Sequence, residues 1–531
     1  MTGSGSVPMS RPLGELLDRL RAEGRVRGTR LDDRPIAASE LGATALTGVT
    51  QDSRAVRPGI LFVAVSGQHV DGHDFVAAAV EAGAAAVVVE RTVAGVAAPQ
   101  VLVDAARPVL ASAAAWWYGD PSHALTVVGI TGTDGKTTTA YLAVAALEAG
   151  GRRTGMIGTI ATRIGGRTEA HDVHATTPEA PELQALLRAM VDAGDEVAVV
   201  ETTSHGLALE RVGSIAYDVA ILTNLTHEHL ELHGTWESYR DAKLSLFDRL
   251  RAGRAVTKPQ PVRATAIVNL DDPSAGVFIG TARDAGARVM TYGTEPAADV
   301  RATRVTEDGR GLHAAIETPG GGATIDLQLG GRFNVHNALA VVALGDALGL
   351  DPVAVRTGLA SLAIVPGRME RIELGQPFGV VVDFAHSPAS LQTVLDLLAP
   401  RAAAAGGGLI AVFGSAGERD TAKRPQMGRI AGERARLVIV TDEDPRGEDR
   451  DAILDEIARG AETAGRRRGQ DLQVIADRRA AIAAAFDAAR PGDIVLLAGK
   501  GHERSIIEAD GERPWDERAV AEEILASMGF G

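Results

Sequence analysis

One stretch of the chain has the residue types and order that are needed to bind the phosphates of a nucleotide. Residues 127–139 read Val-Val-Gly-Ile-Thr-Gly-Thr-Asp-Gly-Lys-Thr-Thr-Thr. Gly132 and Gly135 have no Cβ, so the backbone can approach a ligand closely. The N–H groups at the start of the following helix attract an anion. Lys136 supplies a positive charge for the β- and γ-phosphates, and Thr137 offers a hydroxyl to Mg²⁺.

The stretch departs at one position from the common phosphate-loop pattern. That pattern has a glycine five residues before the glycine of the Gly-Lys pair, where this chain has Ile130. The strand, the glycine turn, the Lys-Thr pair and the helix still occur in the expected order; the alternative is a glycine turn with a surface lysine. We therefore predict an ATP site. Its predicted contacts are Thr131, Gly132, Thr133, Asp134, Gly135, Lys136, Thr137 and Thr138.

Other polar residues that could bind a metal follow apolar, strand-like runs. Glu201 and Asp383 each come directly after such a run, and His229 lies in a polar cluster after another. In parallel sheets, ligands bind at the carboxyl ends of the strands. Mg²⁺ prefers oxygen ligands, and an imidazole can occupy one position in a mixed set. These residues, with Thr137, predict a magnesium site; solvated loops are the alternative.

These residues need a scaffold of strands that alternate with helices. Strand-like runs are found at residues 154–159, 197–202, 219–224, 264–269 and 289–292, and again at 380–384, 409–413, 437–441, 472–475 and 494–498. Such alternation predicts largely parallel sheets covered by helices on both faces. The predicted fold class is α/β with three domains: a smaller α/β N-terminal domain (1–122), a central P-loop-type domain with a mostly parallel sheet (123–365), and a C-terminal Rossmann-like doubly wound domain (366–531).

Length and composition exclude several classes of protein. A chain of 531 residues is too long for one hydrophobic core. A net charge of −15 argues against non-specific binding to nucleic acid or anionic membranes. The absence of cysteine excludes disulfides, thiolate metal sites and a cysteine nucleophile. Residues 1–12 lack the pattern of a signal peptide, and no apolar run approaches the about 18 residues that span a bilayer. A cytoplasmic enzyme is therefore favoured.

The ordered set of motifs resembles the Mur ligases, and among them the tripeptide-synthetase branch, which adds the third amino acid of the peptidoglycan stem peptide. These motifs are residues 52–54, 131–138, 176–179, 201–205, 223–229 with His233, 242–243, 333–337, 366–368, 385–386, 423–425 and 499–503. Single motifs of this kind occur by chance, but the ordered set does not. The Thr-Thr-Pro-Glu run at 176–179 points to this branch rather than to folylpolyglutamate synthetases or the D-Ala-D-Ala-adding ligase.

The resemblance implies that the first domain binds a UDP-sugar, the second ATP and the third an amino acid. The implied UDP-sugar-peptide contacts are Ser53, Gln68, His69, Val70, Thr176, Thr177, Thr203 and Arg211. The ATP site gains Asn334, Asn337, Arg368 and Asp383. Residues 52–54 and 67–74 could instead be solvated turns, and Asn334 a helix cap. Leu209 replaces a glutamine common in the family, which removes one hydrogen bond, whereas Thr203 replaces a serine and keeps the hydroxyl.

The reaction that the resemblance implies begins with conversion of a D-glutamyl carboxylate to an acyl phosphate by ATP. An amine then attacks, and phosphate leaves. Phosphoryl transfer depends on positioning and on neutralised charge. The implied catalytic residues are Lys136, Glu201, His229 and Lys243. Lys243 aligns with a lysine that the family carbamoylates with CO₂, which would make it a ligand of a second Mg²⁺; locally it is an ordinary helix lysine.

The implied partners are UDP-MurNAc-dipeptide and a free diamino acid, for a monomer without nucleic acid or membrane insertion. Family members that take meso-diaminopimelate carry Asp-Asn-Pro-Arg, whose arginine can bind the distal carboxylate in a bidentate manner. Here the run is Glu443-Asp444-Pro445-Arg446, and Arg419, Gly499 and Glu503 complete the predicted amino-acid site. Arg446 favours diaminopimelate, whereas the extra negative charge of Asp444 suits lysine or ornithine.

Two other functions stay open from the sequence. One is a nucleotide-dependent scaffold that has lost catalysis, although the presence of Lys136, Glu201 and Lys243 argues against it. The other is a ligase of the same type that acts on a different acyl acceptor, such as a polyglutamate synthetase.

Overall fold

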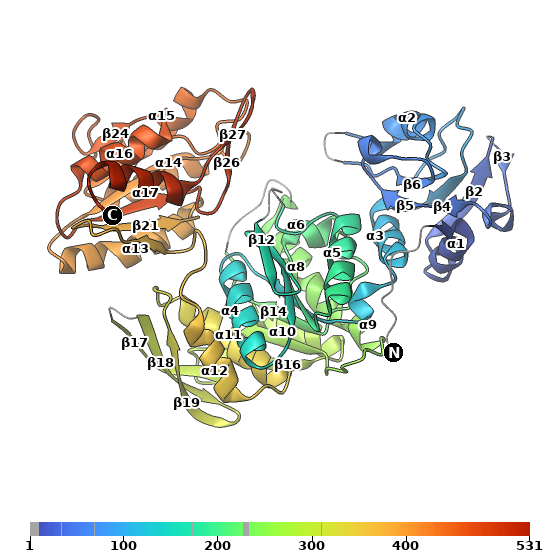
Figure 1. The fold of residues 1–531 in the computed structure, drawn as a ribbon, viewed down its shortest axis with the longest axis horizontal. Coiled ribbons are helices and arrows are strands. Elements are labelled where there is room, and N and C mark those ends of the chain that lie inside the picture. The colour runs from blue at the N-terminus through green and yellow to red at the C-terminus, as the bar shows by residue number, and fades with distance from the viewer. Residues whose placement is uncertain (1–9, 33, 68–69, 171–174, 227–232, 309–310) are drawn as a thin grey trace. The chain divides into compact units, whose positions relative to one another are not determined.

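The structure is a computed structural model, which describes residues 10–32, 34–67, 70–170, 175–226, 233–308 and 311–531 (Figure 1). Contacts divide the chain into two compact units. The first unit comprises residues 1–301, 317–321 and 338–358, and the second comprises residues 302–316, 322–337 and 359–531. The boundaries predicted at residues 122/123 and 365/366 stay predictions.

The N-terminal part of the first unit is a six-stranded sheet with the strand order β3-β2-β8-β7-β6-β5. Strands β5 to β8 are parallel, and β2 runs antiparallel to β8 and β3. The strands are β2 (Val26–Leu31), β3 (Arg34–Pro35), β5 (Gly48–Thr50), β6 (Ile60–Val63), β7 (Ala86–Val89) and β8 (Gln100–Val103). The helices are α1 (Leu13–Ala22), α2 (Val76–Glu81) and α3 (Ala106–Trp117). This confirms a small α/β domain.

The central sheet has eleven strands in the order β12-β11-β10-β13-β9-β14-β15-β16-β17-β18-β19. Its parallel part includes β10 (Thr154–Ile157), β13 (Val197–Glu201), β9 (Thr126–Thr131), β14 (Val219–Leu222), β15 (Thr265–Asn269) and β16 (Arg288–Gly293). The prediction of a mostly parallel P-loop-type sheet is therefore confirmed. The α-helices of this region are α4 (Lys136–Ala149), α5 (Ala180–Ala193), α6 (Ser204–Ala208), α8 (Trp236–Asp248), α9 (Leu250–Arg254), α10 (Ala275–Asp284), α11 (Asn334–Ala347) and α12 (Pro352–Ser361).

The edges of this sheet were not predicted. Strands β11 (Ala161–Ile164) and β12 (Arg167–Ala170) form an antiparallel edge, and all four residues of β12 are exposed. Strands β17 (Val300–Asp308), β18 (Gly311–Thr318) and β19 (Gly321–Leu327) continue the other edge. These strands carry many threonines and charged residues, so they lack the continuous apolar run of a strand that is buried on both faces.

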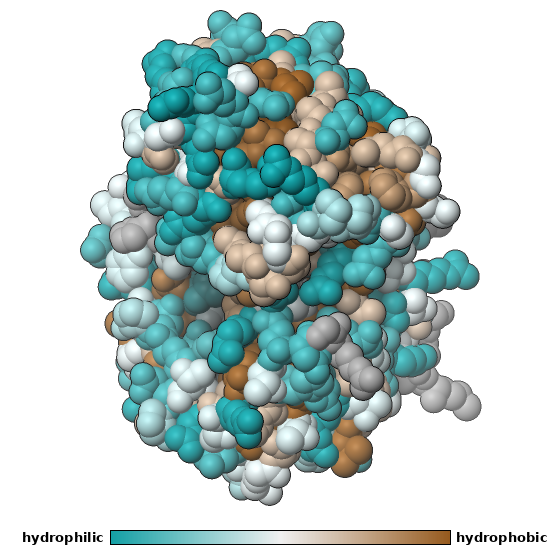
Figure 2. All heavy atoms as spheres, turned by 90° about the vertical axis from the view of Figure 1, so that its left-hand side faces the viewer, coloured by the Kyte–Doolittle hydropathy of each residue, from teal (hydrophilic) through white to brown (hydrophobic). Residues whose placement is uncertain are grey.

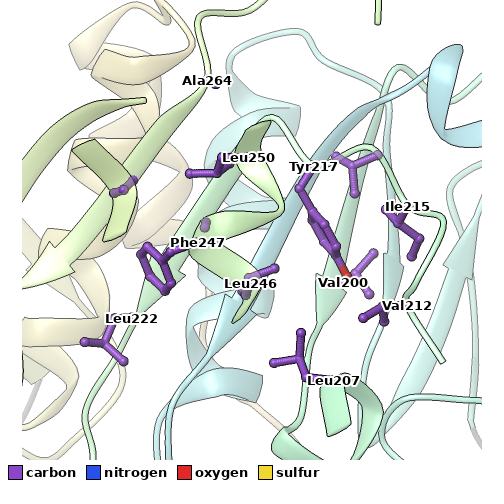
Figure 3. Close-up of a cluster of buried hydrophobic side chains, with 14 of the residues drawn as sticks. Val200, Leu207, Val212, Ile215, Tyr217, Leu222, Leu246, Phe247, Leu250 and Ala264 are labelled. Carbon is purple, nitrogen blue, oxygen red and sulfur yellow. The ribbon is translucent and has the colours of Figure 1, made fainter. Parts of the chain in front are cut away.

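Tyr217 lies in the hydrophobic cluster that packs against the central strands (Figure 3). A Cβ on Gly129 would lie only 2.7 Å from Cε1 of Tyr217, so the glycine in β9 lets the ring lie against the strand. The hydroxyl of Tyr217 lies 3.1 Å from Oγ1 of Thr202, the residue that follows β13. This core therefore fixes the two strands that lead to the phosphate loop and to Glu201.

The C-terminal sheet has the strand order β20-β21-β25-β22-β23-β24, in which β20 alone is antiparallel to its neighbour. The strands are β20 (Glu370–Ile372), β21 (Gly379–Asp383), β22 (Leu409–Phe413), β23 (Leu437–Val440), β24 (Leu472–Val474) and β25 (Ile494–Ala498). The helices are α13 (Pro388–Ala404), α14 (Lys423–Arg434), α15 (Arg450–Thr463), α16 (Arg478–Ala488) and α17 (Glu517–Ser527). A hairpin of β26 (Ser505–Glu508) and β27 (Gly511–Pro514) was not predicted.

Alternate residues of β22 point to opposite faces of this sheet. Leu409, Ala411 and Phe413 pack with residues of α13, α14 and α15. Ile410 and Val412 pack with residues of α16 and α17. Because a strand has a period of two residues, helices cover both faces, as the doubly wound prediction requires.

The face shown in Figure 2 is mostly hydrophilic, and hydrophobic residues lie there in smaller groups. Among the helices that the structure describes, none combines the length and the apolar character needed to cross a bilayer.

Candidate active site

The predicted phosphate loop joins the end of β9 to the start of α4. Gly132 has a φ of +144°, and a Cβ there would lie 1.9 Å from Oγ1 of Thr223. Gly135 precedes the first helical residue with a φ of +83°. The N–H of Asp134 donates to Oδ1 of Asn224 at 3.0 Å. Contacts with the residues after β14 therefore fix this loop, in which Gly132 leaves no room for a Cβ and Gly135 has a left-handed φ that glycine adopts without strain.

Two lysine ammonium groups donate to the same carbonyl oxygen of this loop. Nζ of Lys136 lies 2.9 Å from the oxygen of Gly132 and 2.7 Å from that of Thr133. Nζ of Lys243, on α8, lies 2.6 Å from the oxygen of Gly132. The Lys243 side chain is buried, with its ammonium 4.6 Å from the ring centre of Tyr239. Two like charges this close repel each other, and a bound anion would relieve the repulsion.

Glu201 is fully buried at the end of β13. Its Oε2 accepts hydrogen bonds from Oγ1 of Thr137 and Oγ1 of Thr159, both at 2.9 Å, and its Oε1 accepts one from the N–H of Thr159 at 3.0 Å. None of these three donors carries a charge. Burial of a carboxylate with neutral partners alone is costly, and a cation would offset the cost. The carboxylate and the Thr137 hydroxyl therefore fit Mg²⁺.

The remaining predicted magnesium ligand, His229, lies outside the described residues. Within the described part of the chain, no three His, Asp or Glu side chains gather into a group that could bind a metal. The structure thus brings Lys136, Thr137, Glu201 and Lys243 together around one loop.

A chain of hydroxyl groups connects Glu201 with the residues predicted to contact the muramoyl-dipeptide. Oγ1 of Thr159, which donates to Glu201, lies 3.1 Å from Oγ1 of Thr176 and can accept a hydrogen bond from it. Oγ1 of Thr177 donates to the main-chain oxygen of Glu201 at 2.9 Å and lies 3.0 Å from Oγ1 of Thr203. Nη1 of Arg211 donates to the oxygen of Thr177 at 2.9 Å. Thr176, Thr177, Thr203 and Arg211 therefore form one connected group beside the phosphate loop.

The predicted uridine-side contacts are less well described. Ser53 opens a short 3₁₀ turn, Ser53–Ala55, which the side chain of Asp52 caps by accepting from the N–H of Arg54 at 3.0 Å. Val70 is exposed. Gln68 and His69 lie outside the described residues. The uridine contacts stay predictions.

Four residues predicted to contact ATP lie in the second unit. The guanidinium carbon of Arg368 lies 4.7 Å from the ring centre of Phe384. Oδ2 and Oδ1 of Asp383 accept from the N–H groups of Met369 and Ala385 at 2.8 and 2.9 Å, so this carboxylate orders the chain around it. The amides of Asn334 and Asn337 are joined by a hydrogen bond of 2.9 Å at the start of α11.

The predicted amino-acid site contains an ion pair that joins two loops of the C-terminal sheet. Nζ of Lys500, which is almost fully buried, lies 2.8 Å from Oδ1 of Asp444 and 2.6 Å from Oε2 of Glu503. Oδ1 of Asp444 also accepts from the N–H of Ile507 at 2.9 Å. The negative charge of Asp444 is therefore balanced inside the protein, which weakens the interpretation that it binds an ammonium group of the substrate.

Two other residues of the same loop have unused polar atoms. Oε2 of Glu443 and Nε of Arg446 are buried and form no hydrogen bond with described residues. Glu443 is 6% exposed, and Arg446 has a left-handed φ of +56°. Buried polar atoms normally have hydrogen-bond partners. An anion at Arg446 and an ammonium at Glu443 would supply the missing partners, and an amino acid carries both groups.

Three more predicted residues surround this pair. Gly499 has a φ of +101°, and a Cβ there would lie 2.9 Å from Oε2 of Glu443. Pro445 is buried between Asp444 and Arg446. Arg419 is exposed on the loop after β22. All lie at the carboxyl edge of the C-terminal sheet, where parallel sheets bind ligands.

Comparisons with known proteins agree with this arrangement. Residues 45–118 match the model described as "Mur ligase family, catalytic domain", residues 130–345 the "Mur ligase middle domain", and residues 367–501 the "Mur ligase, glutamate ligase domain". The fold and the site thus define a family of ATP-dependent, ADP-forming amide ligases. The chain belongs to the Mur ligase family.

The names of similar proteins indicate which branch of the family this chain resembles. A UDP-N-acetylmuramyl-tripeptide synthetase of Roseiflexus sp. is 50% identical over 92% of this chain and 96% of its own length. A UDP-N-acetylmuramoyl-L-alanyl-D-glutamate--2,6-diaminopimelate ligase of Geobacter metallireducens is 42% identical over 94% of this chain and its full length. A solved structure of a ligase with the latter name is 29% identical, with a TM-score of 0.62 over 92% of this chain and 97% of its own.

Several residues of the site were not predicted from the sequence. Thr159, which supplies two of the hydrogen bonds to Glu201, follows β10 without a motif around it. The hydroxyl of Tyr239 lies 2.9 Å from Oγ1 of Thr133, and Tyr239 is one turn of α8 before Lys243. Lys500 lies inside the predicted run 499–503. Its position after a strand was a usable signal, whereas the contacts of Thr159 and Tyr239 depend on the folded chain.

His502, in the run 499–503, leads to a prediction of how the stability of the fold depends on pH. His502 lies 4.9 Å from the ring centre of Phe384, and burial, followed by the charge of Arg368, lowers its pKa to about 3. An unfolded histidine takes up a proton near pH 6.5, whereas the folded one does so only near pH 3. The free energy of unfolding should therefore fall as the pH decreases from about 6.5 towards 3.

Replacement of His502 by asparagine should remove this part of the pH dependence. Urea unfolding at pH 7.5 and pH 5 measures it for the parent and for His502→Asn. His313→Asn is a control with the opposite pH dependence. In the parent, hydrogen bonds to Asp326 and Asp308 raise the pKa of His313, so protonation of this histidine stabilises the fold below pH 6.5. An unchanged pH dependence in His502→Asn would contradict the burial of a neutral imidazole.

Proposed function

We propose that the protein joins a diamino acid to the D-glutamyl carboxylate of UDP-MurNAc-L-Ala-D-Glu and converts ATP to ADP and phosphate. The observation that supports this most is the convergence of Lys136 and Lys243 on the oxygen of Gly132, beside the buried carboxylate of Glu201. The names of the relatives agree with this substrate. We favour meso-diaminopimelate as the amino acid, with L-lysine and L-ornithine as alternatives.

The proposed reaction assigns a task to each group of residues. The N–H groups of the phosphate loop and Lys136 bind the terminal phosphates of ATP. The Thr177–Thr203–Arg211 group orients the dipeptide so that its carboxylate oxygen attacks the γ-phosphorus and ADP leaves. The amine of the diamino acid then attacks the acyl carbon, loses a proton and displaces phosphate. Mg²⁺, held by Thr137 and Glu201, would neutralise phosphate charge.

The remaining features are part of the same proposal. The enzyme would use two Mg²⁺ ions, with His229 and a carbamate on Lys243 as further ligands. It would act as a monomer in the cytoplasm, without nucleic acid or membrane insertion. Contacts of Ser53, Gln68, His69 and Val70 with the UDP group, and of Asn334, Asn337, Arg368 and Asp383 with ATP, are also proposed.

The carbamate on Lys243 predicts a specific chemical rescue. Lys243→Ala should lower kcat by about 10²- to 10³-fold, because a charged group beside the transferred phosphate is lost. A short carboxylate such as acetate or formate should restore part of the rate by occupying the space of the carbamate. Chloride at the same ionic strength is the control. Equal rates with acetate and with chloride would contradict the carbamate.

The function itself is tested by phosphate release from ATP. We expect release only when UDP-MurNAc-L-Ala-D-Glu and one of diaminopimelate, lysine or ornithine are both present, and no release with Lys136→Ala. Failure of every amino acid would favour a nucleotide-binding scaffold. Release with a folate in place of the UDP-sugar would favour a polyglutamate synthetase. The amino acid with the highest kcat/KM identifies the third residue of the peptide.

The ion pair of Asp444 predicts that this residue does not select the amino acid. Asp444→Asn should change the ratio of kcat/KM between diaminopimelate and lysine by less than about threefold, because Lys500 balances the charge. Glu443→Gln is the matched control, since its unpaired Oε2 is free for the substrate. This control should raise the KM for the amino acid by about tenfold or more. A tenfold change of preference in Asp444→Asn would disprove the prediction.

A further inference from the structure

A buried arginine and a buried glutamate lie beneath the predicted amino-acid site. Arg478 is the first residue of α16, Glu517 is the first residue of α17, and both side chains are fully buried. Nη2 of Arg478 lies 2.7 Å from Oε1 of Glu517, and Nε lies 2.9 Å from Oε2. Glu517 also accepts from Nε1 of Trp515 at 2.6 Å.

The same guanidinium donates to two main-chain oxygens at the carboxyl edge of the sheet. Nη1 of Arg478 lies 2.9 Å from the oxygen of Asp442, and Nη2 lies 2.8 Å from the oxygen of Ala498. Asp442 immediately precedes the run 443–446, and Ala498 immediately precedes the run 499–503. These runs follow β23 and β25, which are not neighbours, because β22 lies between them. One side chain therefore bridges the starts of both loops.

Arg478 also interacts electrostatically with charged residues of these loops. Burial alone would lower the pKa of Arg478, but Glu517 and, after it, Glu443 and Asp444 raise the pKa above its usual value. Above this level, Lys500 joins the two loops again through Asp444 and Glu503. The loops are thus connected by a guanidinium at their starts and by an ammonium between their side chains.

A buried ion pair of this kind is weak evidence for a contribution to stability. Removal of two charges from water costs about as much as their attraction returns, and apolar replacements of such pairs are often neutral. What an arginine supplies here is geometry, because its planar fork presents fixed donors in several directions, which a lysine cannot reproduce.

We propose that Arg478, oriented by Glu517, is a positioning residue that sets the spacing between the two loops that bind the incoming amino acid. The inference rests on the proposed function, because it takes residues 443–446 and 499–503 to be the amino-acid site. A misplacement of about 1 Å in a binding group can cost about 100-fold in rate, so a small change in this spacing is sufficient.

The opposite edge of the same sheet offers a matched control pair. Arg436 immediately precedes β23, and Asp493 immediately precedes β25. Nε of Arg436 lies 3.3 Å from Oδ1 of Asp493, which also accepts from the N–H of Gly408, just before β22. This pair joins the amino ends of the strands whose carboxyl ends Arg478 joins, and it lies at the edge away from the predicted site.

The test compares Arg478→Met/Glu517→Gln with Arg436→Met/Asp493→Asn. Glutamine at 517 keeps an acceptor for Trp515, and each double variant removes one ion pair. We expect the first variant to raise the KM for the amino acid by about 10- to 100-fold, with the KM values for ATP and for the UDP-sugar within about twofold of the parent. We expect the control variant to leave all three KM values within about twofold, whatever both variants do to the thermal midpoint.

A single substitution keeps the test valid if the first double variant does not fold. Arg478→Lys retains the charge opposite Glu517 but cannot reach both main-chain oxygens, so it should also raise the KM for the amino acid alone. An unchanged KM in a folded Arg478 variant, or equal changes in both double variants, would overturn the inference. Absence of amino-acid-dependent phosphate release by the parent protein would instead overturn the proposed function.

Discussion

The main-chain oxygen of Gly132 is central to the first unit, because it accepts hydrogen bonds from two ammonium groups at the proposed phosphate site. The chain as a whole carries a charge of −15, so its general field repels nucleotides. Lys136 comes from the helix that follows the loop, and Lys243 comes from α8, more than a hundred residues later in the chain. Only a glycine at position 132 gives the loop this conformation, since a Cβ would collide with Thr223. The positive charge gathered at this loop therefore depends on the backbone conformation at Gly132.

The two units place their predicted ligand-binding residues in the same way. In each, parallel strands end at one edge of a sheet, and the residues with chemistry follow those ends. In the first unit, Glu201 is the last residue of β13 and Asn224 follows β14, and both contact groups in or beside the phosphate loop. In the second, residues 443–446 and 499–503 follow β23 and β25. Buried apolar strands fix these positions, so the chemistry at the edge depends on the cores beneath it.

Much of this organisation could be predicted from the sequence, because buried parallel strands are continuous apolar runs. The strands at residues 409–413 and 494–498 were predicted to the residue, and the phosphate loop was recognised although Ile130 replaces a glycine. The edge strands β11, β12 and β17–β19 were missed, since polar residues interrupt their apolar positions and leave no continuous apolar run. The role of Thr159 was missed for a different reason: its two hydrogen bonds to Glu201 span 42 residues of sequence.

Asp444 shows why a local count of charges is not enough to infer a substrate. In the sequence it is one more carboxylate in an acidic run, and an ammonium group on the ligand is its natural partner. In the structure its partner is Lys500, 56 residues away, and the two charges are buried together. We therefore propose that selectivity at the predicted amino-acid site depends on the atoms that remain unpaired, Oε2 of Glu443 and Nε of Arg446. Their opposite charges favour a ligand that carries both an ammonium and a carboxylate near its distal end, and diaminopimelate has this combination, whereas lysine and ornithine have only the ammonium there.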